Sequence, residues 1–294
     1  MTDRSASSVR MRLSRWQLDL FCKCPRCFWL LKRHNIKQPD SYPLALNTCM
    51  DHLLKAEFDQ FRAAGQLHPL FEQYGVEGRL FTDVPRLTEW RNNFQGLRWI
   101  DPASGHTLFG AVDDVLECPD GSLAVIDYKS SGAAAAHVYD SYQLQMDVYT
   151  FLLQCLGYRT APKAFFAFFL AARDQGFQGR LPFRGVLLEV IPQPERVLPL
   201  FTQAVALAQQ EAPPDAGAEC DLCRFAREAL PVVVPRAPSD AAPQPAVSTS
   251  PPPPAPPMRT APAVAPSKTP AARKLQRKRS AATDPQGEFE FAGS

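Results

Sequence analysis

Two carboxylates and an amine lie close together in one stretch of the sequence whose other residues are mostly apolar. Asp113 lies in the apolar run 107–118, and Asp127 and Lys129 lie near the end of the run 122–131. Runs of this length suit buried strands, and the Pro-Asp-Gly sequence between them predicts a turn. Side chains alternate along a strand, so Asp127 and Lys129 should point to the same face. A hairpin made of the two strands would bring Asp113 close to Asp127.

These three groups predict a site for a divalent cation. Two neighbouring carboxylates repel one another unless a cation lies between them, and oxygen ligands favour Mg²⁺ or Mn²⁺. Lys129 could position a water molecule and stabilise charge that develops on a phosphate. The alternative is a surface ion pair between Asp127 and Lys129 with Asp113 solvated. The apolar neighbours and the hairpin spacing argue against that alternative.

A helix is predicted after the second strand, over residues 140–156, and it carries a polar pair. Gln145 and Tyr149 are four residues apart and therefore share one face of this otherwise apolar helix. We expect that face to lie against the ends of the acidic strands, where an amide and a phenol could support the metal ligands or a phosphate backbone. The alternative is a partly buried polar pair without a functional role.

In this order the residues resemble three motifs of the PD-(D/E)XK nuclease superfamily, and within it those of the RecB-like exonucleases. Gly110-Ala-Val-Asp113 matches Gly-x-x-Asp, Asp127-Tyr-Lys129 matches Asp/Glu-x-Lys, and Gln145-Met-Asp-Val-Tyr149 matches Gln-x-x-x-Tyr. The resemblance covers residues 13–227.

The resemblance implies metal-dependent hydrolysis of DNA phosphodiester bonds, in repair, recombination or defence. The cation would be Mg²⁺ or Mn²⁺, held by Asp113, Asp127 and a backbone carbonyl near Tyr128. The implied catalytic residues are Asp113, Asp127, Lys129, Gln145 and Tyr149. Single-stranded DNA or DNA ends are the expected substrates, and proteins of a repair complex are the expected partners.

A histidine on a helix upstream of the strands is a further mark of this family. His52, in the predicted helix 45–64, is the candidate here, as a metal ligand or as a contact to a phosphate. Considered without the resemblance, His52 would be a surface imidazole with no role.

Two Cys-x-x-Cys pairs, Cys24 with Cys27 and Cys220 with Cys223, could each place two thiolates on one metal ion. Together they could close a tetrahedral zinc site or hold an iron–sulfur cluster. In several RecB-like nucleases one N-terminal and three C-terminal cysteines hold a four-iron cluster. This chain has no third C-terminal cysteine, so Cys24 with Cys27, or Cys22, would have to supply the missing ligand. The alternative is that these cysteines hold no metal.

The composition changes near Leu230, which predicts two regions. Of the last 64 residues 15 are proline, so we expect residues 231–294 to be a disordered Pro/Ala-rich tail. Its basic cluster, 273–279, could add salt-sensitive affinity for DNA or simply keep the tail soluble. Residues 1–230 are long enough for one domain with a substantial core. Their predicted elements indicate an α/β fold, a central mixed β-sheet flanked by helices, as in the core of restriction endonucleases.

Charge and hydropathy narrow the class of protein. The net charge is +2, of which the predicted tail carries +4, so the folded part has no excess of basic residues. Contact with nucleic acid would then depend on a local groove and on the metal. No run of 18 apolar residues and no signal peptide is found, so we expect a cytoplasmic protein without a membrane span.

The rival hypothesis is a catalytically silent nucleic-acid-binding or scaffolding module of a repair or CRISPR-type complex. The near-neutral folded part and the missing cysteine favour this rival. The intact acidic pair and its lysine argue against it.

Overall fold

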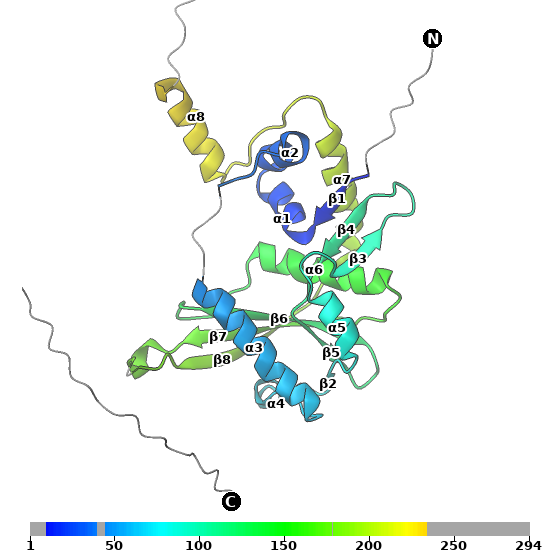
Figure 1. The fold of residues 1–294 in the computed structure, drawn as a ribbon, viewed down its shortest axis with the longest axis vertical. Coiled ribbons are helices and arrows are strands. Elements are labelled where there is room, and N and C mark those ends of the chain that lie inside the picture. The colour runs from blue at the N-terminus through cyan, green and yellow to red at the C-terminus, as the bar shows by residue number, and fades with distance from the viewer. Residues whose placement is uncertain (1–9, 40–44, 178, 234–294) are drawn as a thin grey trace, which may run out of the picture. The chain divides into compact units, whose positions relative to one another are not determined.

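A computed structural model describes residues 10–39, 45–177 and 179–233 of the chain (Figure 1). All of these residues belong to one compact unit. The predicted tail lies outside the described residues, apart from positions 231–233 at the end of the last helix.

A five-stranded mixed sheet forms the centre of the fold. Its strand order is β2-β5-β6-β7-β8, in which β6 and β7 are parallel and the other neighbours are antiparallel. The strands are β2 (Arg79–Leu80), β5 (Asp114–Glu117), β6 (Leu123–Ser131), β7 (Ala164–Ala171) and β8 (Phe183–Val190). The predicted α/β fold with a central mixed sheet is therefore confirmed.

The predicted hairpin is present between β5 and β6. In its register Asp114 lies opposite Ile126, so the next position along brings Asp113 opposite Asp127. The turn closes where the N–H of Gly121 donates to the carbonyl of Cys118, at 2.8 Å, and Gly121 has a φ of 78° that favours glycine.

The prediction of a single strand over residues 107–118 is wrong, because this run forms two strands in the structure. Its first half is β4 (Thr107–Gly110), which belongs to a separate three-stranded sheet of order β1-β4-β3, with β1 at Arg12–Ser14 and β3 at Leu97–Ile100. Residues 111–113 cross from this sheet to the central one. Both halves are mostly buried and apolar, so the residue pattern does not reveal the break. Asp113 consequently lies at a bend just before β5.

Helices cover both faces of the central sheet (Figure 1). On one face, helix α3 (Ala45–Ala63) packs its buried Phe58 with Ile126 and Tyr128 of β6. On the other face, helix α6 (Asp140–Cys155) packs against Val125. Because side chains alternate along β6, Asp127 and Lys129 point toward α6. The remaining helices are α1 (Arg15–Lys23), α2 (Pro25–His34), α4 (Pro69–Gln73), α5 (Val84–Trp90), α7 (Val197–Gln209) and α8 (Asp221–Val233), with 3-10 turns at Arg173–Gln175 and Pro194–Arg196.

The first two helices begin with residues that favour helix starts. Ser14 caps α1 through a reciprocal pair of hydrogen bonds with Gln17, and Pro25 lies in the first turn of α2. Among the described residues, no helix is both long and apolar enough to cross a membrane.

Replacing Phe58 tests the packing of α3 on the sheet. Phe58 is fully buried and its ring contacts those of His68, Phe71 and Tyr128. We expect Phe58→Ala to lower the free energy of unfolding by about 3–5 kcal/mol, because it leaves a cavity in the core. Urea denaturation would measure the loss. Phe94→Ala is the matched control, since Phe94 is 83% exposed and its removal should change stability by less than about 0.5 kcal/mol.

Candidate active site and cysteine cluster

The two predicted carboxylates meet where the β5–β6 hairpin begins. One oxygen of Asp113 accepts a hydrogen bond from the backbone N–H of Tyr128, at 3.0 Å. Asp127 is 1% exposed, whereas the side chain of Asp113 keeps 19% of its surface in contact with solvent. Burial raises the pKa of Asp127 to about 7; the charge of Lys129 acts against this rise and that of Asp113 adds to it. The pair therefore has a buried member and a member that solvent reaches.

Lys129 lies on the same face as Asp127, as its spacing predicted. Its ammonium donates to Asp127 and, at 3.3 Å, to the amide oxygen of Gln145. The same ammonium lies over the ring of Tyr142, 4.8 Å from its centroid. Burial opposes the charge of Lys129, but the neighbouring Asp127 raises its pKa. The site therefore holds a lysine that stays protonated and is fixed in orientation.

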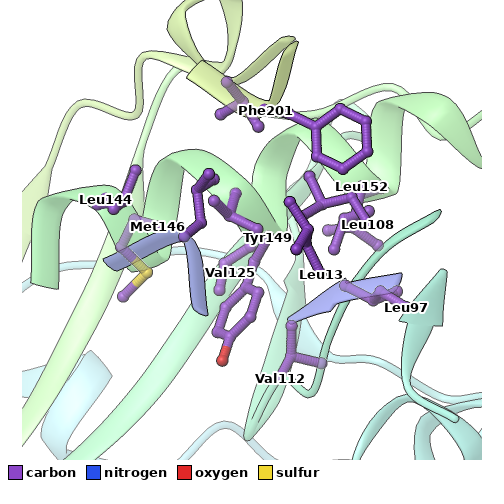
Figure 2. Close-up of a cluster of buried hydrophobic side chains, with 14 of the residues drawn as sticks. Leu13, Leu97, Leu108, Val112, Val125, Leu144, Met146, Tyr149, Leu152 and Phe201 are labelled. Carbon is purple, nitrogen blue, oxygen red and sulfur yellow. The ribbon is translucent and has the colours of Figure 1, made fainter. Parts of the chain in front are cut away.

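Gln145 and Tyr149 also reach this site from α6. The amide nitrogen of Gln145 donates to Asp127 at 2.6 Å and contacts the Tyr149 hydroxyl at 3.3 Å. Figure 2 shows the ring of Tyr149 among buried apolar side chains, with its oxygen pointing away from the helix. The ring lies against Gly110, where an added Cβ would come within 2.6 Å of it. The glycine of the first motif thus makes room for the tyrosine of the third.

The structure does not place His52 in this group. His52 is exposed, and within the described part of the chain no contact joins it to Asp113 or Asp127. Lys55 of the same helix reaches the site instead, with its ammonium 3.0 Å from Asp113 and 2.8 Å from Asp51. Asp51 and Lys55 are four residues apart and so share a helix face. This spacing was visible in the sequence, but nothing there showed that the face meets Asp113.

Arg15 is a second cation near the site that the sequence did not reveal. It is the first residue of α1 and is partly buried, and its charge lowers the pKa of Asp127, though by less than burial raises it. No carboxylate among the described residues forms an ion pair with Arg15.

Asp114, next to Asp113, takes part in a buried ion network that holds the bend in place. Its fully buried carboxylate accepts hydrogen bonds from Arg62 at 2.5 Å, from Arg91 at 3.1 Å and from the hydroxyl of Tyr128 at 2.5 Å. Arg91 also donates to the backbone carbonyl of Asp113, at 2.6 Å. Two arginines from distant parts of the chain therefore hold the Asp114 side chain, and Arg91 also holds the backbone of Asp113.

The two Cys-x-x-Cys pairs converge, as four thiolates on one metal require. The Sγ atoms lie 3.7 Å apart for Cys24 and Cys223, 3.7 Å for Cys27 and Cys220, and 3.5 Å for Cys27 and Cys223. All four sulfurs lie within 4.8 Å of one another and could hold a metal ion. Burial raises the pKa of Cys24, but hydrogen bonds from the N–H groups of Gly217 and Cys27 outweigh it and bring the pKa down to about 7.

Asp114→Ala tests whether the buried network supports the site. This change leaves the guanidinium of Arg62, whose side chain is 4% exposed, without its buried partner. We expect a loss of about 3–5 kcal/mol in the free energy of unfolding, measured by urea denaturation. Asp174→Ala, at an exposed position, should cost less than about 0.5 kcal/mol. A loss below 1 kcal/mol at Asp114 would show that the network does not stabilise the fold.

Comparison with known proteins identifies the family. The sequence profile of the PD-(D/E)XK nuclease superfamily matches residues 37–227. No curated protein matches significantly. The crystal structure of SSO0001 is similar with a TM-score of 0.37 and 13% identity, over 74% of this chain and 84% of that one. The profile match spans most of the chain and includes the acidic pair, the lysine and the polar residues of α6. The chain therefore belongs to the PD-(D/E)XK nuclease superfamily.

Proposed function

We propose that this protein is a deoxyribonuclease of the RecB-like branch that hydrolyses phosphodiester bonds with Mg²⁺ or Mn²⁺. One observation carries the proposal: Asp127 is buried, and Lys129 and Gln145 hold its carboxylate beside Asp113. Burying a carboxylate is costly unless it has partners. A site that buries one acidic group, pairs it with a lysine and leaves a second acidic group open to solvent suits metal-dependent catalysis better than stability alone.

Asp113 and Asp127 would hold the cation, together with the backbone carbonyl of Tyr128. The donor set fits, because it consists of oxygens alone and a hard cation would relieve the repulsion between the carboxylates. When bound, the cation would supply Lewis-acid polarisation of the phosphate and a more acidic water. We leave His52 out of the ligand set because its side chain is exposed. Helix α3 instead places Asp51 near Asp113, since the ammonium of Lys55 forms an ion pair with both carboxylates.

The other residues would orient the reactants and bind the substrate. Lys129 would position the attacking water and donate to the phosphate oxygens as negative charge develops there. Gln145 would hold the carboxylate of Asp127, with its own amide placed beside the hydroxyl of Tyr149. Arg15 and Lys55 would supply the local positive charge for a phosphate that the net charge of the folded part does not provide.

The expected substrates remain single-stranded DNA or DNA ends, and the expected setting is repair, recombination or defence in the cytoplasm, with protein partners. These assignments rest on the resemblance to RecB-like exonucleases. The position of Asp113 at the solvent-accessible end of the hairpin is compatible with a DNA strand passing over the site.

Lys129→Ala tests the nuclease assignment. We expect cleavage to fall by at least about 10²-fold, because the variant loses the donor that stabilises the phosphate. The assay would follow labelled single-stranded DNA, double-stranded DNA and RNA with Mn²⁺. Lys163→Ala is the matched control, and circular dichroism would confirm that both variants fold. Undiminished metal-dependent cleavage by Lys129→Ala would refute the role given to this residue. A wild-type protein that binds DNA without cutting it would favour a silent binding module.

Lys55→Met tests whether Lys55 competes with the metal. Its ammonium now neutralises Asp113, so its removal should strengthen Mn²⁺ binding by about tenfold, or about 1.4 kcal/mol. Isothermal titration would measure the affinity, with Lys163→Met as the control and Asp113→Asn as the variant that abolishes binding. Unchanged affinity in Lys55→Met would show that the lysine and the metal do not share Asp113.

A further inference from the structure

The cluster formed by Cys24, Cys27, Cys220 and Cys223 has a geometry that distinguishes between two kinds of metal centre. We propose that these thiolates bind one Zn²⁺ ion in a tetrahedral site, and not the four-iron cluster implied by the resemblance to RecB-like nucleases. The proposal does not depend on the nuclease activity.

The separations of the sulfurs match a single ion. A Zn–S bond of about 2.3 Å gives a tetrahedron whose sulfurs are about 3.8 Å apart. The observed separations of 3.5, 3.7 and 3.7 Å lie close to that value, and no pair is further apart than 4.8 Å. In a four-iron cluster each thiolate binds a different iron, so a core of eight atoms keeps the thiolates apart. Sulfurs this close leave no room for such a core.

The two pairs occupy equivalent positions at the starts of two helices. Cys24 is the N-cap of α2 and Cys27 lies in the first turn, while Cys220 directly precedes α8 and Cys223 lies in its first turn. Backbone N–H groups at helix starts favour negative charge, which suits thiolates. Four ligands complete a tetrahedral site, so the lack of a third C-terminal cysteine leaves no gap. Cys22 is exposed and lies outside the cluster.

The loop before α8 packs closely against Cys24 through Gly217. An added Cβ at Gly217 would lie 2.1 Å from the carbonyl oxygen of Lys23 and 3.1 Å from the Cα of Cys24, so only glycine permits this approach. The N–H of Gly217 then donates to the sulfur of Cys24 at 3.3 Å, and the N–H of Cys27 does so at 3.5 Å. Four thiolates around Zn²⁺ carry a net negative charge, and such N–H donors offset it.

The metal would join parts of the chain that are nearly 200 residues apart. Cys24 and Cys223 are separated by 199 positions, and the ion would fix the start of α8 to α1 and α2. Since α1 begins with Arg15, the same ion would support the helix that brings this cation to the active site.

Metal analysis of the full-length chain tests the proposal. The protein would be produced in cells supplied with both iron and zinc and purified without oxygen. We expect one zinc per chain, no acid-labile sulfide and no visible absorption. Replacement of zinc by Co²⁺ should give the intense visible ligand-field bands of a tetrahedral tetrathiolate site. Iron with sulfide, a protein that holds no metal, or a Co²⁺ spectrum of six-coordinate type would each overturn the assignment.

Variants identify the ligands. We expect Cys223→Ser to lose the zinc and the matched control Cys22→Ser to keep it. Gly217→Ala, which keeps all four thiols, should release zinc to a chelator at least tenfold faster than the wild type. Asp127→Asn should retain one zinc per chain, which would separate this centre from the nuclease site. If Cys223→Ser does not fold, the Co²⁺ spectrum of the wild type still decides the geometry. Full zinc occupancy in Cys223→Ser would contradict the proposed ligand set.

Discussion

Each carboxylate of the β5–β6 hairpin needs partners in proportion to its burial, because an unpaired buried charge is costly. Asp114 is surrounded by two guanidinium groups and a phenol, so its charge is fully satisfied within the protein. Asp127 has one ammonium and one amide. Asp113 has a backbone N–H and a lysine on a helix surface, and it remains open to solvent. Two adjacent aspartates therefore differ in their surroundings: the carboxylate of Asp114 is enclosed by its partners, whereas that of Asp113 keeps part of its surface in contact with solvent.

Packing makes the three motifs depend on one another. The ring of Tyr149 fits only because position 110 has no side chain, and the hydroxyl at its far end contacts the amide that holds Asp127. The bend after Gly110 then carries Asp113, whose backbone Arg91 holds. The glycine, the acidic pair and the α6 residues are thus parts of one packed unit. The Tyr149 ring fills the space beside Gly110, and the Gln145 amide satisfies the buried carboxylate of Asp127.

The cysteine cluster lies at the start of helix α8, which packs weakly against the rest of the fold. Helix α8 exposes much of its apolar surface, including Phe225, so packing alone gives it little support. A metal ion bound by the four sulfurs, which come from both ends of the folded region, would supply the constraint that apolar burial does not. Metal–thiolate bonds are short and have a fixed geometry, so a metal site can stabilise a helix that makes few other contacts.

The sequence by itself determined the local features. Residue periodicity placed Asp127 and Lys129 on one face of β6 and Gln145 with Tyr149 on one face of α6, and turn chemistry located the hairpin. Only the tertiary structure decided that the run 107–118 forms strands in two different sheets and that Lys55, not His52, contacts Asp113. It also brought Arg62 and Arg91 to Asp114, which no sequence pattern signals. The reason is physical: alternation and helical spacing depend on neighbours along the chain, whereas burial, ion pairing and the approach of distant thiols depend on how the elements pack.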